Sequence, residues 1–152
     1  MTIDELGGDA ILWVASAGGH SRQALRWSTI LGNHQTSVFV VSDTPQNRGL
    51  FQGSQAFFLG SVKSRQLLPP IRFFLGLLRQ TPWRQAGTII STGSSVAIPA
   101  LTFFALFTRK KVIYIESLTR VTLPSLSGRL LSFVPRVSLY SPHNTLGDRW
   151  AY

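Results

Sequence analysis

The sequence predicts a doubly wound α/β domain built on a parallel β-sheet. Short runs rich in Val, Ile and aromatic residues alternate with helix-like segments, which is the order expected of strand–helix–strand units. Most of these runs are apolar at consecutive positions, as is typical of strands covered on both faces. A length of 152 residues with no repeat or linker indicates one domain over residues 1–152.

Six strands and four helices account for the alternation. The expected strands are Ala10–Ala15, Thr36–Val41, Gln55–Leu59, Thr88–Ser91, Lys111–Glu116 and Arg136–Tyr140. The expected helices are Ser21–Leu31, Pro70–Thr81, Ser95–Thr108 and Pro124–Val134. Pro70 suits the first turn of its helix, because the N–H that proline lacks has no partner there, and Pro82 ends that helix.

Composition excludes several classes of protein. The chain has no cysteine, which rules out disulfides and thiolate metal sites, and its histidines (His20, His34 and His143) lack metal-ligand spacing. The N-terminus carries acids and no basic segment, so it is not a secretory signal. The longest nearly apolar run, from Val96 to Phe107, is shorter than the ~20 residues that a membrane-spanning helix needs. We therefore expect a protein that stays in the cytosol.

The chain is strongly basic and also rich in apolar residues. Fifteen Lys and Arg face six acids, and no acid lies between Asp43 and Glu116. A basic surface binds anions, which could be nucleic acid, lipid headgroups or phosphorylated substrates. Hydrophobic residues make up 44% of the chain and include ten phenylalanines and four tryptophans. This combination favours a lipid surface, and we expect no nucleic-acid partner.

Three of the expected strands end in small or polar residues. These strand ends are Ser16–Ser21, Ser91–Ser95 and Glu116–Arg120. In α/β folds, ligands bind beyond the carboxyl ends of the strands. Glycine lets the backbone approach a ligand closely, and free N–H groups at the start of the next helix suit phosphate. Each turn alone could be plain connection chemistry, but together the turns predict a site for a diphosphate.

The first turn does not match the better-known phosphate fingerprints. A dinucleotide site has the pattern G-x-G-x-x-G, and here Ser16 and Ser21 replace the first and third glycines. Asp43 does close the second strand, where a ribose-binding acid would lie, so a dinucleotide-binding oxidoreductase domain stays an alternative. Neither a G-x-x-x-x-G-K-[ST] loop nor a G-x-S-x-G hydrolase elbow is present.

The three turns and their flanks resemble one protein family. The segments concerned are SAGGHSRQAL, ISTGSSVAIPALTFFAL and KKVIYIESLTRVTLPSLSGRLL. They are similar to the oligosaccharide-biosynthesis family that contains the Alg-fourteen subunit of the dolichol-linked N-acetylglucosaminyltransferase and the bacterial PssD/CpsF-type proteins. The resemblance runs from about Ile11 to the C-terminus. The run IYIES-x-x-R-V-x-x-x-S-x-S-G-[KR]-L-L is its most specific element. A more distant similarity is to the N-terminal half of the lipid II-forming enzyme MurG.

The resemblance implies a Rossmann-like N-terminal, acceptor-side lobe of a GT-B glycosyltransferase. In that family a separate donor-lobe chain, of the Alg-thirteen-like or PssE/CpsG type, carries most of the nucleotide-sugar pocket. The implied reaction transfers a sugar with inversion from a UDP-sugar substrate to a polyprenyl-diphosphate-linked saccharide, without a cofactor or catalytic metal. The eukaryotic subunit has an N-terminal membrane helix, and nothing similar precedes Ile11 here. We therefore expect peripheral attachment at the cytoplasmic face of the membrane.

The resemblance also implies candidate site residues. His20 could be the general base that takes the proton of a sugar hydroxyl, a ligand of the acceptor diphosphate, or a helix cap. Glu116 could be a base or a ligand of the acceptor hydroxyl, or it could pair with Arg120 or stabilise the start of the next helix. The residues expected to meet phosphate or sugar are Ser16, Gly18, Gly19, Thr92, Gly93, Ser94, Ser95, Ser117 and Arg120.

Residues 63–85 form a basic and apolar segment, in which five basic residues and no acid surround an apolar helix. A soluble amphipathic helix rarely needs that much apolar surface, so we expect the segment to lie in the interface of an anionic membrane. The expected contacts are Arg65, Arg72, Phe73, Phe74, Leu77, Arg79, Trp83 and Arg84. A helix packed between the sheet and a partner chain is the alternative. An alternative function is a non-catalytic membrane adaptor, which would recruit a glycosyltransferase partner without supplying residues to the chemistry.

Overall fold

The computed structural model describes residues 10–32, 36–60, 68–120, 122–143 and 150–151. They form a seven-stranded sheet in the order β3-β2-β1-β4-β5-β6-β7, in which every neighbouring pair is parallel. The strands are β1 Ala10–Ala15, β2 Ser37–Ser42, β3 Ala56–Leu59, β4 Ala86–Ser91, β5 Lys111–Ile115, β6 Val137–Tyr140 and β7 Trp150–Ala151. The helices are α1 Gly19–Ile30, α2 Pro45–Leu50, α3 Leu68–Gln80, α4 Ala97–Phe107 and α5 Leu126–Leu131. The predicted Rossmann-like α/β fold is confirmed.

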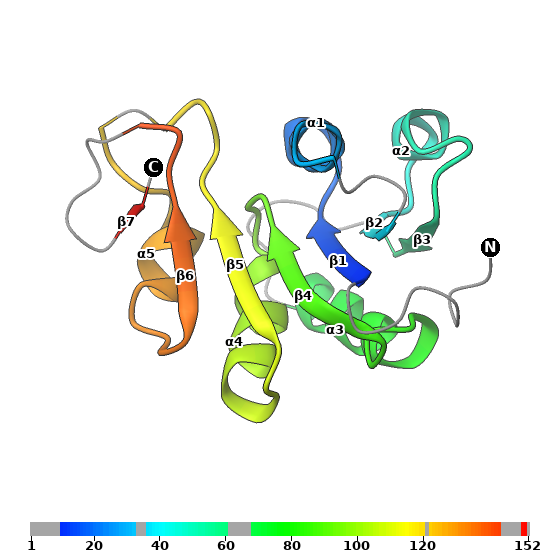
Figure 1. The fold of residues 1–152 in the computed structure, drawn as a ribbon. Coiled ribbons are helices and arrows are strands. Elements are labelled where there is room, and N and C mark those ends of the chain that lie inside the picture. The colour runs from blue at the N-terminus through cyan, green and yellow to red at the C-terminus, as the bar shows by residue number, and fades with distance from the viewer. Residues whose placement is uncertain (1–9, 33–35, 61–67, 121, 144–149, 152) are drawn as a thin grey trace.

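The helices lie on both faces of the sheet. Figure 1 shows α1 and α2 on one face and α3, α4 and α5 on the other. Parallel strands are joined by right-handed crossovers, so the direction in which the chain crosses the sheet decides the face on which a helix packs. The chain moves outward from β1 to β3 and then crosses back to β4 and on to β6. This reversal at β1 and β4 separates the two groups of helices.

Each face of the sheet has its own apolar core. On the side of α3, α4 and α5 the core includes Leu77, Leu101 and Phe104, all with no exposed surface. On the side of α1 and α2 it includes Trp13 and Phe39, whose rings stack with centroids 6.4 Å apart. All six residues of β1 and all six of β2 are buried. The continuous apolar runs in the sequence therefore reflect strands that are covered on both faces.

Two elements of the fold were not expected from the sequence. The helix α2 has six residues, too few to show a helical period, and its signals are the Thr44 cap, which accepts a hydrogen bond from Asn47 N at 3.1 Å, and Pro45 in the first turn. The strand β7 has two residues. The bounds of all four expected helices also differ: α3 begins at Leu68 instead of Pro70, and α4 begins at Ala97 instead of Ser95. The helix α1 begins at Gly19 instead of Ser21, and α5 covers only the middle of the expected segment, after a Ser125 cap.

Candidate functional site

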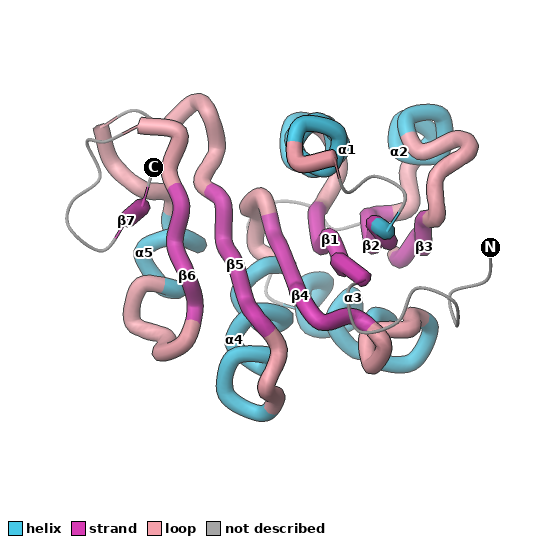
Figure 2. Tube along the Cα trace, viewed as in Figure 1, coloured by secondary structure: helices cyan, strands magenta, loops and turns pink. Residues whose placement is uncertain are grey.

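The three polar strand ends lie at one edge of the sheet. Strands β1, β4 and β5 are neighbours, and Figure 2 shows the loops after β4 and β5 at the same edge as the start of α1. Hydrogen bonds join the three ends. His20 and Thr92 connect the first to the second, Ser127 Oγ donates to Ser94 O at 3.1 Å, and Gln23 Nε2 donates to Glu116 O at 2.9 Å. Hydrogen bonds, in part through α1 and α5, therefore connect the three sequence motifs at this edge of the sheet.

The imidazole of His20 is held by the second turn. Its Nδ1 lies 2.9 Å from Thr92 O, and Thr92 Oγ1 donates back to His20 O at 2.7 Å. A carbonyl oxygen can only accept a hydrogen bond, so Nδ1 carries the proton and Nε2 of the neutral ring keeps its lone pair. The ring is half-buried. This arrangement presents one oriented acceptor nitrogen that can take a proton from a ligand.

Gly93 leaves the space that the His20 ring fills. Its φ is +110°, and a Cβ atom there would lie 2.8 Å from His20 Cε1 and 2.9 Å from Nδ1. Both the backbone conformation and the contact require glycine. The second turn thus fixes the position of the His20 ring through the Thr92 carbonyl and the bare Gly93 backbone.

We expect Gly93→Ala to displace the His20 ring and to lower the free energy of unfolding by about 1–3 kcal/mol, because of the strained φ and the contact. Denaturant unfolding measures the change in the free energy of unfolding. The ¹⁵N chemical shifts of the imidazole in NMR report whether Nδ1 still carries the proton. Gly19→Ala is the matched control, since nothing lies within 4 Å of a Cβ at Gly19. Unchanged His20 signals in Gly93→Ala would contradict this account.

The N-terminus of α1 is open. Gly18 precedes it with φ +78°, no side chain caps the helix, and its first turn has no acid. Gly19 is exposed. The first N–H groups of a helix have no partner within the helix and form the positive end of its dipole. Beside the His20 ring, this end of α1 therefore suits an anionic group such as phosphate.

The carboxylate of Glu116 is buried and fully engaged. It has no exposed surface, and both oxygens accept hydrogen bonds: Oε1 from Ser117 N at 2.8 Å, and Oε2 from Ser125 N at 2.8 Å and Ser125 Oγ at 3.0 Å. Within the described residues no ion pair joins it to Arg120, which is exposed, and no hydrogen bond joins it to His20. This geometry favours an anchor between the end of β5 and the start of α5 over direct contact with a ligand.

Tyr114 is a site residue that the sequence reasoning missed. Its side chain is fully buried, and its hydroxyl lies 2.9 Å from Ser125 Oγ and 3.4 Å from Glu116 Oε1. Burial, followed by the charge of Glu116, raises the pKa of Tyr114 well above its ordinary value, so the hydroxyl keeps its proton. A Cβ on Gly93 would lie 3.5 Å from this hydroxyl. The signal in the sequence was a tyrosine in a mostly apolar strand, two residues before Glu116.

Ser94 combines backbone strain with an unpaired hydroxyl. Its φ is +78°, which is unusual for a residue other than glycine. Its buried Oγ has no hydrogen-bond partner within the part of the chain that the structure describes. Strained backbone and orphaned polar atoms are both costly, and both concentrate at binding sites. We regard the Ser94 hydroxyl as a candidate ligand contact.

The other residues expected to meet phosphate or sugar lie in the same three strand ends. Ser16 is buried, and its Oγ lies 3.4 Å from Ala17 O. Ser95 and Ser117 are half-buried, and Ser117 Oγ lies 3.0 Å from Thr119 Oγ1. The structure shows their positions but no ligand, so their binding roles stay predictions.

Asn47 is a second residue that the sequence reasoning missed. It has no exposed surface, and it accepts a hydrogen bond from Ser21 Oγ at 2.7 Å and donates to Ser42 O at 2.8 Å. It therefore fixes the start of α1 against the ends of β1 and β2. Because it belongs to the unexpected helix α2, no pattern in the sequence marked it.

The acid that a ribose would need is already engaged. Asp43 follows β2 and accepts two hydrogen bonds from Arg48, at 2.7 and 2.9 Å. The hydrogen bond from Arg48 holds the pKa of Asp43 below its usual range. This pairing weakens the dinucleotide alternative, although it leaves the alternative untested. Among the described residues no three His, Asp or Glu side chains come together in a way that could hold a metal ion.

The segment expected at a membrane forms α3 and the turn after it. Phe73 and Leu77 are buried in the core, so they do not form a surface for lipid, in contrast to the expectation. Their spacing of four residues places both on the inner face of the helix. The outer face exposes Leu68, Ile71, Arg72, Leu75 and Arg79. Phe74 and Trp83 are half-buried, Arg84 is exposed beside the Trp83 ring, and Arg65 lies outside the described residues.

No helix in the described ranges combines the length and the apolar character needed to cross a bilayer.

Comparison with known proteins identifies a similar fold. The crystal structure of Acinetobacter baumannii MurG matches with a TM-score of 0.65 at 15% sequence identity, covering 94% of this chain and 44% of that one. At this identity the match shows the fold alone, and the chain spans less than half the length of the matched protein. No family model and no curated protein sequence matches the chain.

Proposed function

We propose that this chain is the membrane-associated, acceptor-binding subunit of a two-chain inverting glycosyltransferase. The observation that supports the proposal is the set of hydrogen bonds that connects the three strand ends, with His20 Nε2 unpaired among the described residues and close to the N-terminus of α1. The family resemblance of these motifs and the MurG-like fold support it. A chain that covers 44% of MurG leaves room for a second lobe, which we assign to a donor-lobe partner chain.

In this proposal the acceptor's diphosphate binds at the N-terminus of α1 and at the second turn. Backbone N–H groups and the Ser94 hydroxyl would donate hydrogen bonds to it. The acceptor sugar hydroxyl then lies near His20 Nε2, which takes its proton as the oxygen attacks the anomeric carbon of the UDP-sugar. The new glycosidic C–O bond forms as the bond to UDP breaks, and UDP leaves with the electron pair. The proton on His20 returns to solvent.

In this proposal the buried side chains of Glu116, Tyr114 and Thr92 support the arrangement without touching the substrate. The Glu116 carboxylate holds Ser117 and Ser125 in place, and Tyr114 adds a hydroxyl to the same network. Thr92 orients the imidazole. Proton transfer therefore falls to His20, and Glu116 is an anchor.

The two-chain requirement is directly testable. We expect the purified chain to show little or no transfer from UDP-sugars to a polyprenyl-diphosphate-linked acceptor, because it supplies one lobe of the active site. Adding a donor-lobe chain should restore turnover, measured as UDP release together with acceptor elongation. Robust turnover by the single chain would contradict the two-chain proposal.

The exposed face of α3 is the proposed contact with an anionic membrane. Arg72 and Arg79 lie on it, and each basic residue near such a surface contributes about 1 kcal/mol. We therefore expect Arg72→Glu with Arg79→Glu to lower partition into anionic liposomes by about 30-fold or more, in a salt-sensitive way. The matched control is Arg22→Glu with Arg26→Glu, which makes the same charge change on α1 at the opposite face. Equal loss in both variants would indicate attraction by net charge alone.

A further inference from the structure

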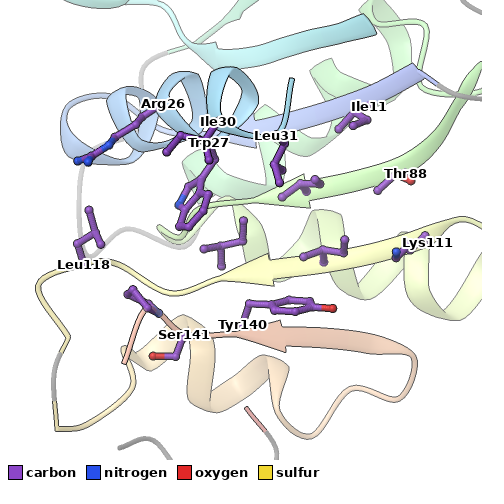
Figure 3. A pocket seen from close by; sticks show the side chains of 14 residues that line it. Ile11, Arg26, Trp27, Ile30, Leu31, Thr88, Lys111, Leu118, Tyr140 and Ser141 are labelled. Atoms are coloured by element: carbon purple, nitrogen blue, oxygen red, sulfur yellow. The ribbon is translucent and has the colours of Figure 1, made fainter. Parts of the chain in front are cut away.

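An apolar groove lies on the sheet beside α1, away from α4 and α5. It has a volume of about 850 Å³ and runs along β4, β5 and β6. Its floor includes Ile90, Ile113 and Ile115, and α1 forms one wall with Trp27 and Ile30 (Figure 3). Several side chains that line it are exposed, among them Ile30 at 60%, whereas Ile90 and Ile115 are buried. The groove does not include His20, and at the carboxyl end of β5 it reaches Leu118 in the third strand end.

The topology explains why the groove is open. The crossovers from β4 to β6 place α4 and α5 on the far face, so within the described residues no helix packs over β5 and β6 on the near face. The residues of β1 and β2, by contrast, are all buried. Parallel sheets are normally covered on both faces, because their strands are apolar all along. The uncovered face of β5 and β6 is therefore where a further helix could pack beside α1.

Positive charge marks both ends of the groove. Figure 3 shows Arg26 near the carboxyl end of the strands and Lys111 at the start of β5. Within the described residues neither forms an ion pair: the carboxylate of Asp43 is taken by Arg48 and that of Glu116 is buried. An occupant with carboxylates near both ends would complement these cations.

We propose that the groove docks an amphipathic helix of a partner protein, with an apolar stripe facing the sheet and acidic residues near both ends. The five residues of β5 span about 16 Å, which matches about 11 residues of α-helix. A second copy of the chain would bring the same two cations to a two-fold interface. A lipid with one anionic headgroup could complement the cation at only one end of the groove. The inference rests on the groove alone and does not depend on glycosyl transfer.

The test uses the full chain and two labelled helical peptides of about 14 residues. Both have leucines at i, i+3, i+4 and i+7. One has glutamates in its first and last turns, and the other has lysines there. Fluorescence anisotropy should show at least about tenfold tighter binding of the glutamate peptide to the wild-type chain. Arg26→Glu should abolish this preference, because Lys111 keeps its charge at the other end, and Ile30→Glu should weaken binding at least about tenfold. Phe133→Glu is the control, because Phe133 is 82% exposed and does not line the groove.

Three results would overturn the proposal. The first is that the wild-type chain binds neither peptide or both equally. The second is that sedimentation shows a dimer that Ile30→Glu disperses and Phe133→Glu does not, which would assign the groove to a second copy. The third is that a fluorescent fatty acid binds in an Ile30-dependent way while the glutamate peptide does not. Arg26→Glu alters an exposed charge only, so it decides the question even if Ile30→Glu fails to fold.

Discussion

Replacing His20 by alanine is expected to lower the kcat of the proposed two-chain transferase by about 10²–10⁴-fold, with the KM for the acceptor little changed. The reason is the geometry of the ring: Thr92 O accepts the Nδ1 proton, so Nε2 is the nitrogen that can take a proton from the attacking hydroxyl. An interaction that acts only in the transition state appears in kcat. Steady-state kinetics at varied acceptor concentration, with the donor-lobe chain in excess, give both constants.

Gly19→Val provides the contrast for this measurement. Nothing lies within 4 Å of a Cβ at Gly19, so the side chain fits the free protein and obstructs only a ligand at the N-terminus of α1. We expect it to raise the acceptor KM. A raised KM with an intact kcat in His20→Ala would instead make His20 a binding residue. A fall in kcat/KM of less than about threefold would remove it from both roles and favour a non-catalytic adaptor.

Much of the fold could be predicted because the sheet is covered on both faces. Buried strands require apolar residues at consecutive positions, as in β1 and β2, and this signal is independent of partners far along the chain. The α2 helix lacked such a signal, since six residues make fewer than two turns. The predicted start of α1, at Ser21, was two residues too late, because Gly18, with φ +78°, allows the helix to begin at Gly19 without a capping side chain.

The meeting of the three turns could also be predicted, since parallel strands bring their carboxyl ends to one edge. The contacts that each side chain makes within these turns could not be predicted. Glu116 stands at the expected strand end, but two of its hydrogen bonds come from Ser125, nine residues later, and no local pattern announces that contact. Phe73 and Leu77 are the opposite case. Their spacing of four residues already indicated one shared face of α3, which the core then covers.

Glu116→Ala is expected to lower the free energy of unfolding by about 3–5 kcal/mol, a large part of the stability of a domain this size. The substitution leaves the backbone N–H groups of Ser117 and Ser125 without their acceptor, and each unsatisfied buried donor costs about 1–3 kcal/mol. Glu116→Gln should lose less, because its amide retains one acceptor oxygen. Urea unfolding monitored by tryptophan fluorescence measures the change, with an unchanged m-value showing that the transition is comparable.

The other described acid provides the control for Glu116. Asp43 is exposed and pairs with Arg48 at the surface, so Asp43→Ala should leave the urea midpoint nearly unchanged. At urea concentrations below its own unfolding midpoint, the Glu116→Gln variant should keep a kcat within about threefold of the wild-type value. The reason is that the Glu116 carboxylate holds the site together and does not take the proton. A stable Glu116→Gln variant with a kcat reduced by about 10²-fold or more would make Glu116, instead of His20, the general base.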